Sequence, residues 1–155
     1  MQNKNIILGV TGGIAAYKSA ELVRMLRAQG ARVRVVMTKN ACEFITPLTM
    51  QTLSGHTVYT EMFNQHLNTS LEHISLARWA DAVVIAPASA NLIAKLAHGL
   101  ADDLLTTTCL ATTAPLAIVP AMNKEMWATT VTQENIAALK KREISSFCIC
   151  AGNFS

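Results

Sequence analysis

Four short apolar runs recur along the chain, and each ends at or beside a proline or a polar residue. They cover residues 6–10, 31–38, 82–87 and 116–119. Three of the runs are continuous, whereas the second alternates Arg32 and Arg34 with valines. Continuous apolar runs of this length are typical of strands that are buried on both faces of a parallel sheet.

Between these runs, apolar residues recur at helical spacing. Residues 15–29 are the clearest example, because Ala16, Ala20, Val23 and Leu26 share one face. Further helices are predicted at 40–45, 47–53, 90–99, 104–111 and 131–142. Thr130 and Gln133 are expected to form a capping box for the last helix, and residues 57–63 are either a strand or a loop.

Strands that alternate with helices in this way predict an α/β domain. We expect a doubly wound parallel sheet with helices on both faces, which is a Rossmann-like, flavodoxin-type three-layer sandwich. The 155 residues suit a single domain that extends over residues 1–155.

Composition narrows the class of protein. The chain is 51% hydrophobic and 15% charged, and its net charge of +3 is spread along the sequence, so nucleic-acid binding is not expected. The first residues lead directly into a strand, and no apolar run is long enough to span a bilayer. The four cysteines lack zinc-binding spacing. These features predict a reduced, cytoplasmic protein with neither a membrane anchor nor a metal site.

Polar groups follow three of the predicted strands, at residues 11–13, 89–91 and 123. The carboxyl ends of parallel strands share one edge, where ligands bind in open α/β sheets. Gly12 and Gly13 either let a phosphate approach the N–H groups of the next helix or form a plain turn. The second strand ends in Thr38 rather than in an acid that would bind a dinucleotide ribose, so a mononucleotide is favoured over NAD. Ser89 and Asn123 are each either a helix cap or a ligand-binding group.

Several motifs together resemble the homo-oligomeric flavin-containing cysteine decarboxylase family. Residues 120–127 read P-A-M-N-K-E-M-W, which is similar to the family signature P-x-M-N-x-x-M-W. Residues 72–76, E-H-I-S-L, resemble the segment with its active-site histidine. Residues 9–18 resemble its first phosphate turn, and residues 87–106 its flavin-contacting loop and the helix that follows.

The resemblance implies that FMN is bound without a covalent bond where the subunits of a homotrimer meet, and that trimers can assemble into a dodecamer. The phosphate would lie near Gly12, Gly13 and Ser89. Further cofactor contacts are implied for Ile14, Thr38, Ala90, Asn91 and Thr106.

Within the family, the likeness is strongest to enzymes that decarboxylate 4'-phosphopantothenoylcysteine towards 4'-phosphopantetheine in coenzyme A biosynthesis. In these enzymes FMN oxidises the thiol-bearing carbon, CO2 leaves, and the hydride is returned. The resemblance implies that His73 accepts a proton during the oxidation and that the Asn123 amide holds the substrate carboxylate. Met126 would line the substrate pocket, and Arg78 would meet anionic substrate groups at the subunit interface.

After residue 142 the sequence departs from the family pattern. The family continues to an A-C-G-x-x-G-x-G-R motif, whose cysteine donates the proton for the reductive half of the reaction. Residues 143–155 contain Cys150-Ala151-Gly152, which differs from that motif in order and distance. We therefore expect the oxidative half-reaction, leave the reductive half open, and expect neither the substrate-clamp motif nor a ligase domain.

Two alternatives share the same flavin site. One is a decarboxylase of peptides that end in cysteine, and the other is a non-catalytic, flavin-binding regulatory subunit. A flavin prenyltransferase is disfavoured, because the signature at residues 120–127 belongs to the cysteine decarboxylases.

Overall fold

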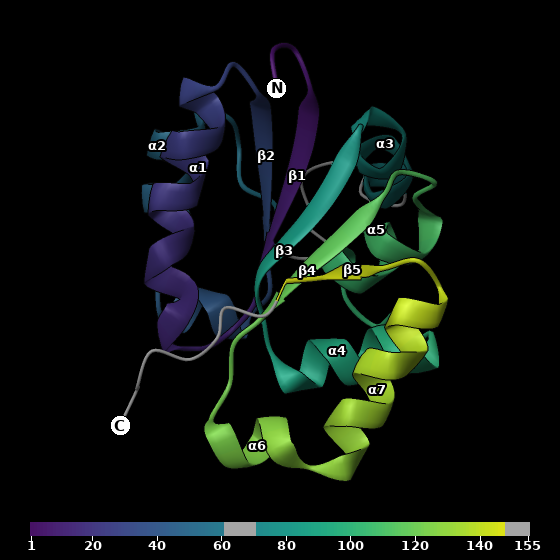
Figure 1. The fold of residues 1–155 in the computed structure, drawn as a ribbon. Coiled ribbons are helices and arrows are strands. Elements are labelled where there is room, and N and C mark those ends of the chain that lie inside the picture. Colours follow the sequence, from purple (N-terminus) through teal and green to yellow (C-terminus); the bar gives the residue numbers. More distant parts are fainter. Residues whose placement is uncertain (61–70, 148–155) are drawn as a thin grey trace.

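The computed structural model describes residues 1–60 and 71–147. This part of the chain forms a parallel sheet with the strand order β2-β1-β3-β4-β5 (Figure 1). The strands are β1 (Asn5–Val10), β2 (Arg32–Met37), β3 (Ala82–Ala88), β4 (Leu116–Pro120) and β5 (Ser145–Ser146). The order confirms the predicted flavodoxin-type fold. It also places the topological switch point between β1 and β3, since the chain winds outward from these two strands in opposite directions.

Helices cover both faces of the sheet (Figure 1). One face carries α1 (Lys18–Ala28) and α2 (Pro47–Ser54), each preceded by a 3-10 turn, η1 (Ile14–Tyr17) or η2 (Asn40–Glu43). The other face carries α3 (Glu72–Trp79), α4 (Ala90–His98), α5 (Leu104–Ala111) and α7 (Thr130–Lys141), and the short α6 (Lys124–Ala128) joins β4 to α7. Within residues 1–60 and 71–147, no helix combines the length and apolarity needed to cross a bilayer.

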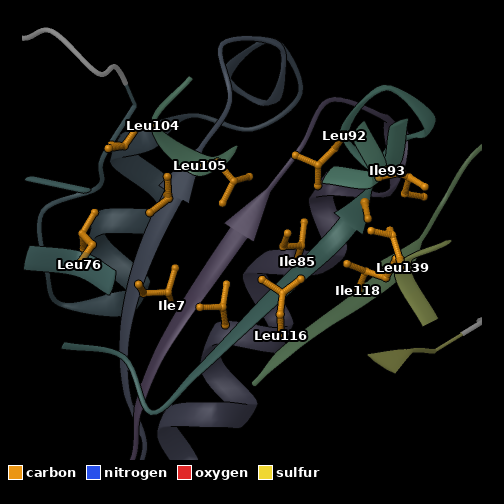
Figure 2. Packing of buried hydrophobic residues seen from close by; sticks show 14 of the residues in the cluster. Ile7, Leu76, Ile85, Leu92, Ile93, Leu104, Leu105, Leu116, Ile118 and Leu139 are labelled. Carbon is orange, nitrogen blue, oxygen red and sulfur yellow. The ribbon is translucent and has the colours of Figure 1, made fainter. Parts of the chain in front are cut away.

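Successive residues of the central strands enter two different cores. Ile7 enters the core between the sheet and α3, α4, α5 and α7, which Figure 2 shows from close by. Its neighbours Ile6 and Leu8 enter the core beneath α1 and α2. Burial on both faces explains why the strands read as continuous apolar runs rather than as alternating ones.

The predicted helices are present, with local differences. The helix expected at 15–29 opens as the 3-10 turn η1 and becomes α-helical at Lys18, and the one expected at 40–45 is only the 3-10 turn η2. Pro120 stays within β4 and pairs with Ala88 across a register shift, so this proline ends the strand one residue later than expected. Neither α3 nor β5 was predicted from the sequence. Tyr59 forms an isolated bridge with Val36, whereas residues 61–63 and 148–155 lie outside the described residues.

The capping box expected from Thr130 and Gln133 is wrong. Thr129 is the N-cap of α7, and it makes no side-chain bond to the helix N–H groups. Its hydroxyl donates to the carbonyl of Met126 at 2.9 Å instead. The Gln133 amide donates to the carbonyl of Trp127 at 2.7 Å. The pattern failed because α7 begins at Thr130, so Thr130 is the first helical residue and Thr129 takes the N-cap position.

Candidate functional site

Hydrogen bonds join the carboxyl ends of four neighbouring strands into one edge. Thr38, after β2, donates its N–H to the last carbonyl of β1 at 3.0 Å. Thr11, after β1, donates its hydroxyl to the carbonyl of Pro87 in β3 at 2.7 Å. Ala121, after β4, donates its N–H to the carbonyl of Ala88 at 3.1 Å. The polar strand ends noted in the sequence therefore lie along one edge, as expected.

The Gly12–Gly13 turn begins at this edge. A Cβ on Gly12 would lie 2.6 Å from the Cβ of Asn40, so only glycine allows η2 to approach this closely. Gly13 has φ 157° and ψ 159°, a region of backbone conformation that is essentially restricted to glycine. Apart from Gly13 and its two chain neighbours, no described residue has an atom within 4 Å of the position that a Cβ on Gly13 would take. The turn is thus closed towards η2 and open beside Gly13, where Ile14 follows with 72% of its surface exposed.

The first turn of α4 lies beside the glycine turn. Ser89 is the N-cap of this helix, because its Oγ accepts a hydrogen bond from the N–H of Leu92 at 3.2 Å. The N–H of Ser89 itself donates to the Thr11 hydroxyl at 2.9 Å. The N–H groups of Ala90 and Asn91 precede the first intrahelical hydrogen bonds. The structure therefore confirms the capping role of Ser89 and places helix N–H donors, which suit an anion, at the sheet edge.

The segment at residues 120–127 partly buries Met122 and Trp127 and exposes Asn123 and Met126, the two residues that were predicted to meet the substrate. Met122 and Trp127 pack against the core beneath α3, α4, α5 and α7. The Asn123 Oδ1 accepts from the N–H of Glu125 at 2.8 Å and from that of Met126 at 3.4 Å, so Asn123 caps α6. This cap uses only the oxygen of the amide, and the two Nδ2 donors take no part in it. Met126 is 48% exposed.

His73 lies in the first turn of α3. At the far end of this helix, Asp81 donates its N–H to the carbonyl of Asn5, at the amino end of β1. Because eight helical residues rise about 12 Å, the first turn of α3 lies towards the carboxyl edge of the sheet. Helical spacing puts His73 on the face of α3 that carries the buried Leu76 and Ala77.

The Nδ1 atom of His73 is buried and has no hydrogen-bond partner among the described residues. Buried polar nitrogens in proteins are normally paired, so this atom is a candidate for contact with a bound molecule. Burial also raises the pKa of the neighbouring Glu72 carboxyl above its usual value. The first turn of α3 therefore partly shields polar groups from water.

Arg78 lies on a different face of α3. It lines a surface groove of about 520 Å³ together with Leu71, Ile74, Ser75 and Trp79. The Arg34 guanidinium stacks on the Trp79 ring, 4.3 Å from its centre. Five residues along a helix turn through about 500°, which leaves His73 and Arg78 roughly 140° apart. The structure therefore does not bring these two predicted site residues together within one chain.

Thr106, which was predicted to contact the flavin, is 1% exposed. It forms a capping box with Asp103, whose Oδ1 accepts from the N–H of Thr106 at 2.7 Å while its N–H donates to the Thr106 hydroxyl at 3.3 Å. Lys95 holds the same loop, because its Nζ lies 2.9 Å from the Asp102 carboxylate and 3.6 Å from that of Asp103. The hydrogen bond to Lys95 lowers the pKa of Asp102, and the same bond raises the pKa of Lys95. The two acids thus fix the loop between α4 and α5.

The sequence did not indicate that Thr11 and Asn40 help to shape the carboxyl edge of the sheet. The Thr11 hydroxyl bonds to residues that lie 76 and 78 positions further along the chain. Asn40 lies against Gly12 from η2. No local spacing could reveal either contact, because both depend on how the strands are arranged in the sheet.

Comparison with known proteins decides the family. The model of the Flavoprotein family matches residues 1–153. The chain belongs to this family. It is 51% identical over 144 residues to the Coenzyme A biosynthesis bifunctional protein CoaBC of Haemophilus influenzae, and the match covers 93% of this chain and 36% of that protein. The chain thus spans about a third of the length of the curated relatives it matches.

Solved structures of related proteins share the fold. The FMN-dependent cysteine decarboxylase SpaF is 33% identical with a TM-score of 0.90, and the match covers 96% of this chain and 86% of that one. A PPC decarboxylase mutant complexed with pantothenoylaminoethenethiol is 32% identical with a TM-score of 0.79, over 94% of this chain and 82% of that one. The resemblance that the sequence motifs indicated is confirmed.

Proposed function

We propose that this chain holds FMN without a covalent bond and decarboxylates 4'-phosphopantothenoylcysteine towards 4'-phosphopantetheine in coenzyme A biosynthesis. The observation that carries the proposal is the buried Nδ1 of His73, which has no partner among the described residues and belongs to the end of α3 that lies towards the carboxyl edge of the sheet. The identity of 51% to a protein named for coenzyme A biosynthesis supports this substrate.

The residues along the edge fit a flavin mononucleotide. Open space beside Gly13 and the N–H groups at the start of α4 suit a phosphate. We assign the phosphate to Gly12, Gly13 and Ser89, with donors from Ala90 and Asn91.

The rest of the cofactor would contact Thr38 and the exposed Ile14. Thr38 stands where a dinucleotide site would need an acid. Because its hydroxyl is used in a capping box, Thr106 would act through the loop that this box holds in place.

FMN, when bound, supplies a two-electron acceptor for the thiol-bearing carbon of the substrate. The chain's own contribution to that oxidation is a place for the proton. A neutral imidazole can accept one at a nitrogen that makes no other bond, and Nδ1 of His73 meets this condition among the described residues. We therefore assign to His73 the role of general base for the substrate thiol.

Asn123 would hold the substrate carboxylate. Its Oδ1 is fixed by two N–H groups of α6, which orients the amide and leaves Nδ2 to donate two hydrogen bonds. An amide binds a carboxylate without a full positive charge, so it does not strongly favour the ionised ground state over the departing CO2. Met126, exposed one turn further along, would line the pocket for the remainder of the substrate.

Arg78 would complete the site from a second subunit. Arg78 and His73 lie on different faces of α3, which favours a substrate that meets these two side chains from different chains. We infer a homotrimer, with trimers able to assemble into a dodecamer, in which each substrate meets the His73 of one chain and the Arg78 of another. Light scattering that showed a monomer at full FMN occupancy would contradict this assembly.

The test combines cofactor and substrate. Denaturing the purified protein should release FMN, whereas FAD or NAD would contradict the site assignment. The FMN-loaded protein is then offered 4'-phosphopantothenoylcysteine and, separately, a short peptide that ends in cysteine. Release of CO2 from the first compound alone supports the proposal. Release from the peptide alone would assign a peptide substrate, and no release from either would favour a non-catalytic flavin-binding subunit.

A further inference from the structure

The hydroxyl of Thr11 makes two hydrogen bonds at the switch point between β1 and β3. It donates to the carbonyl of Pro87 at 2.7 Å and accepts from the N–H of Ser89 at 2.9 Å. Thr11 is 1% exposed, so water does not compete strongly for either bond. The Thr11 hydroxyl thus donates one hydrogen bond and accepts another, so this buried polar group is paired in both ways.

The Thr11 side chain adds a contact between the ends of β1 and β3, beyond the region of regular strand pairing. Regular pairing of the two strands extends to Gly9 and Ile85. Pro87 has no N–H to donate, although its carbonyl accepts from the N–H of Thr11 at 3.3 Å. The N–H of Ser89, the residue after β3, donates to the Thr11 side chain.

The bond also joins the two segments assigned above to the phosphate. Gly12 follows Thr11 directly in the chain, and Ser89 caps the first turn of α4 through its Oγ. A single oxygen therefore sets the spacing between the glycine turn and the helix N–H groups. We propose that Thr11 is a positioning residue for the phosphate of FMN, acting through Ser89 and Gly12. This inference rests on the proposed function.

Ser19 provides a matched control. Its hydroxyl is also buried, at 2% exposure, and donates to the carbonyl of Ala86 in the same strand at 2.7 Å. It therefore ties α1 to β3 with a bond of the same kind. The Ser19 hydroxyl bonds to Ala86, whereas the N–H of Ser89 bonds to Thr11. Ser19→Ala removes a buried hydroxyl-to-carbonyl bond without touching the proposed link.

The experiment measures the Kd of FMN and of riboflavin by fluorescence quenching, on flavin-free protein whose thermal unfolding is recorded in parallel. Thr11→Val keeps the shape of the side chain and removes the hydroxyl. We expect this variant to bind FMN about tenfold more weakly, the equivalent of one lost hydrogen bond, with riboflavin affected less than about twofold. Thr11→Ser should restore FMN binding, and Ser19→Ala should bind FMN like the unchanged chain.

Equal FMN affinity for Thr11→Val and the unchanged chain would overturn the proposal. An equal loss in Ser19→Ala, or an equal loss for riboflavin, would also overturn it, since a general loosening of the fold would explain either result. If Thr11→Val fails to fold, Thr11→Cys is compared with Thr11→Ser, because a thiol is the weaker hydrogen-bonding group. If Thr11→Cys and Thr11→Ser then bind FMN equally well, the proposal that Thr11 positions the phosphate is overturned. If the unchanged chain binds no FMN, the proposed function itself fails, and the positioning role fails with it.

Discussion

Asn123 caps the helix that carries Met126, and its Oδ1 accepts the N–H of that residue at 3.4 Å. The same side chain is the one assigned to the substrate carboxylate, so capping and substrate binding use opposite ends of one amide. These two roles can be separated experimentally, because aspartate caps helices as well as asparagine does.

Asn123→Asp should keep the cap and lose the substrate contact. The new carboxylate would offer oxygen acceptors in place of the amide donors and would repel the substrate carboxylate. We expect CO2 release to fall by about a hundredfold, with the thermal midpoint close to that of the unchanged chain. Asn123→Ala, which loses both roles, should in addition cost about 1 kcal/mol of stability. CO2 release at the normal rate from Asn123→Asp would show that the amide nitrogen has no part in the reaction.

Gly12→Ala should disturb the glycine turn. The added Cβ would lie 2.6 Å from that of Asn40, so η2 or the turn must move, and overpacking of this kind costs roughly 1–3 kcal/mol. We expect weaker FMN binding, measured by fluorescence titration. The second substitution Asn40→Gly removes the opposing Cβ and should restore part of the affinity. A double variant no better than Gly12→Ala would argue against this contact as the cause.

Arg142 should stabilise the end of α4. It donates from Nη1 to the carbonyl of Leu96 at 3.1 Å and from Nη2 to that of Ala97 at 2.8 Å, which places a cation at the negative end of the helix dipole. Arg142→Ala should therefore lower the free energy of unfolding by about 1–2 kcal/mol. Lys141→Ala, the neighbouring exposed cation, serves as the control and should change it by less than about 0.5 kcal/mol. Equal urea midpoints for the two variants would contradict this account.

Cys109 should resist alkylation in the folded protein. Desolvation of this half-buried side chain, with a smaller contribution from the Asp103 charge, raises the pKa of its thiol from 9.0 to about 12. At pH 8 this leaves about a thousandfold less thiolate than in the unfolded chain. Iodoacetamide followed by mass spectrometry should therefore label Cys109 only after unfolding in urea, and rapid labelling of the native protein would refute the assigned pKa.

The same shift has a consequence for stability at high pH. Because the folded state keeps the Cys109 thiol protonated, its contribution is fully present below the unfolded pKa of 9.0 and is lost as the pH rises towards about 12. Cys109→Ala should lack this part of the alkaline decline when urea unfolding is measured across that range.

Much of the fold follows from local patterns. The apolar runs that became β1, β3 and β4 were readable because burial on both faces leaves no polar positions within them. The edge where they end was also predictable, since parallel strands share their carboxyl side. By contrast, Thr130 and Gln133 matched a capping rule that the structure does not use, while Asp103 and Thr106 form a box that the usual sequence rule, with Glu or Gln at its end, does not describe.

The site was less readable where it depends on three-dimensional placement. A spacing of five residues between His73 and Arg78 gave no warning that α3 would turn them to different faces, because α3 had not been assigned as a helix. The link from Thr11 to Ser89 spans 78 positions, and only the strand order β1-β3 brings its two ends together.

The central claim is that this chain decarboxylates 4'-phosphopantothenoylcysteine with His73 as the base. The most direct measurement is the rate of CO2 release by the FMN-loaded protein, compared with His73→Asn and with His98→Asn, a control at the exposed end of α4. The account predicts that the unchanged chain and His98→Asn release CO2 alike, and that His73→Asn does so at least about a hundredfold more slowly while its FMN spectrum is retained. Release of CO2 by His73→Asn at the unchanged rate, or none from the unchanged chain at full FMN occupancy, would contradict it.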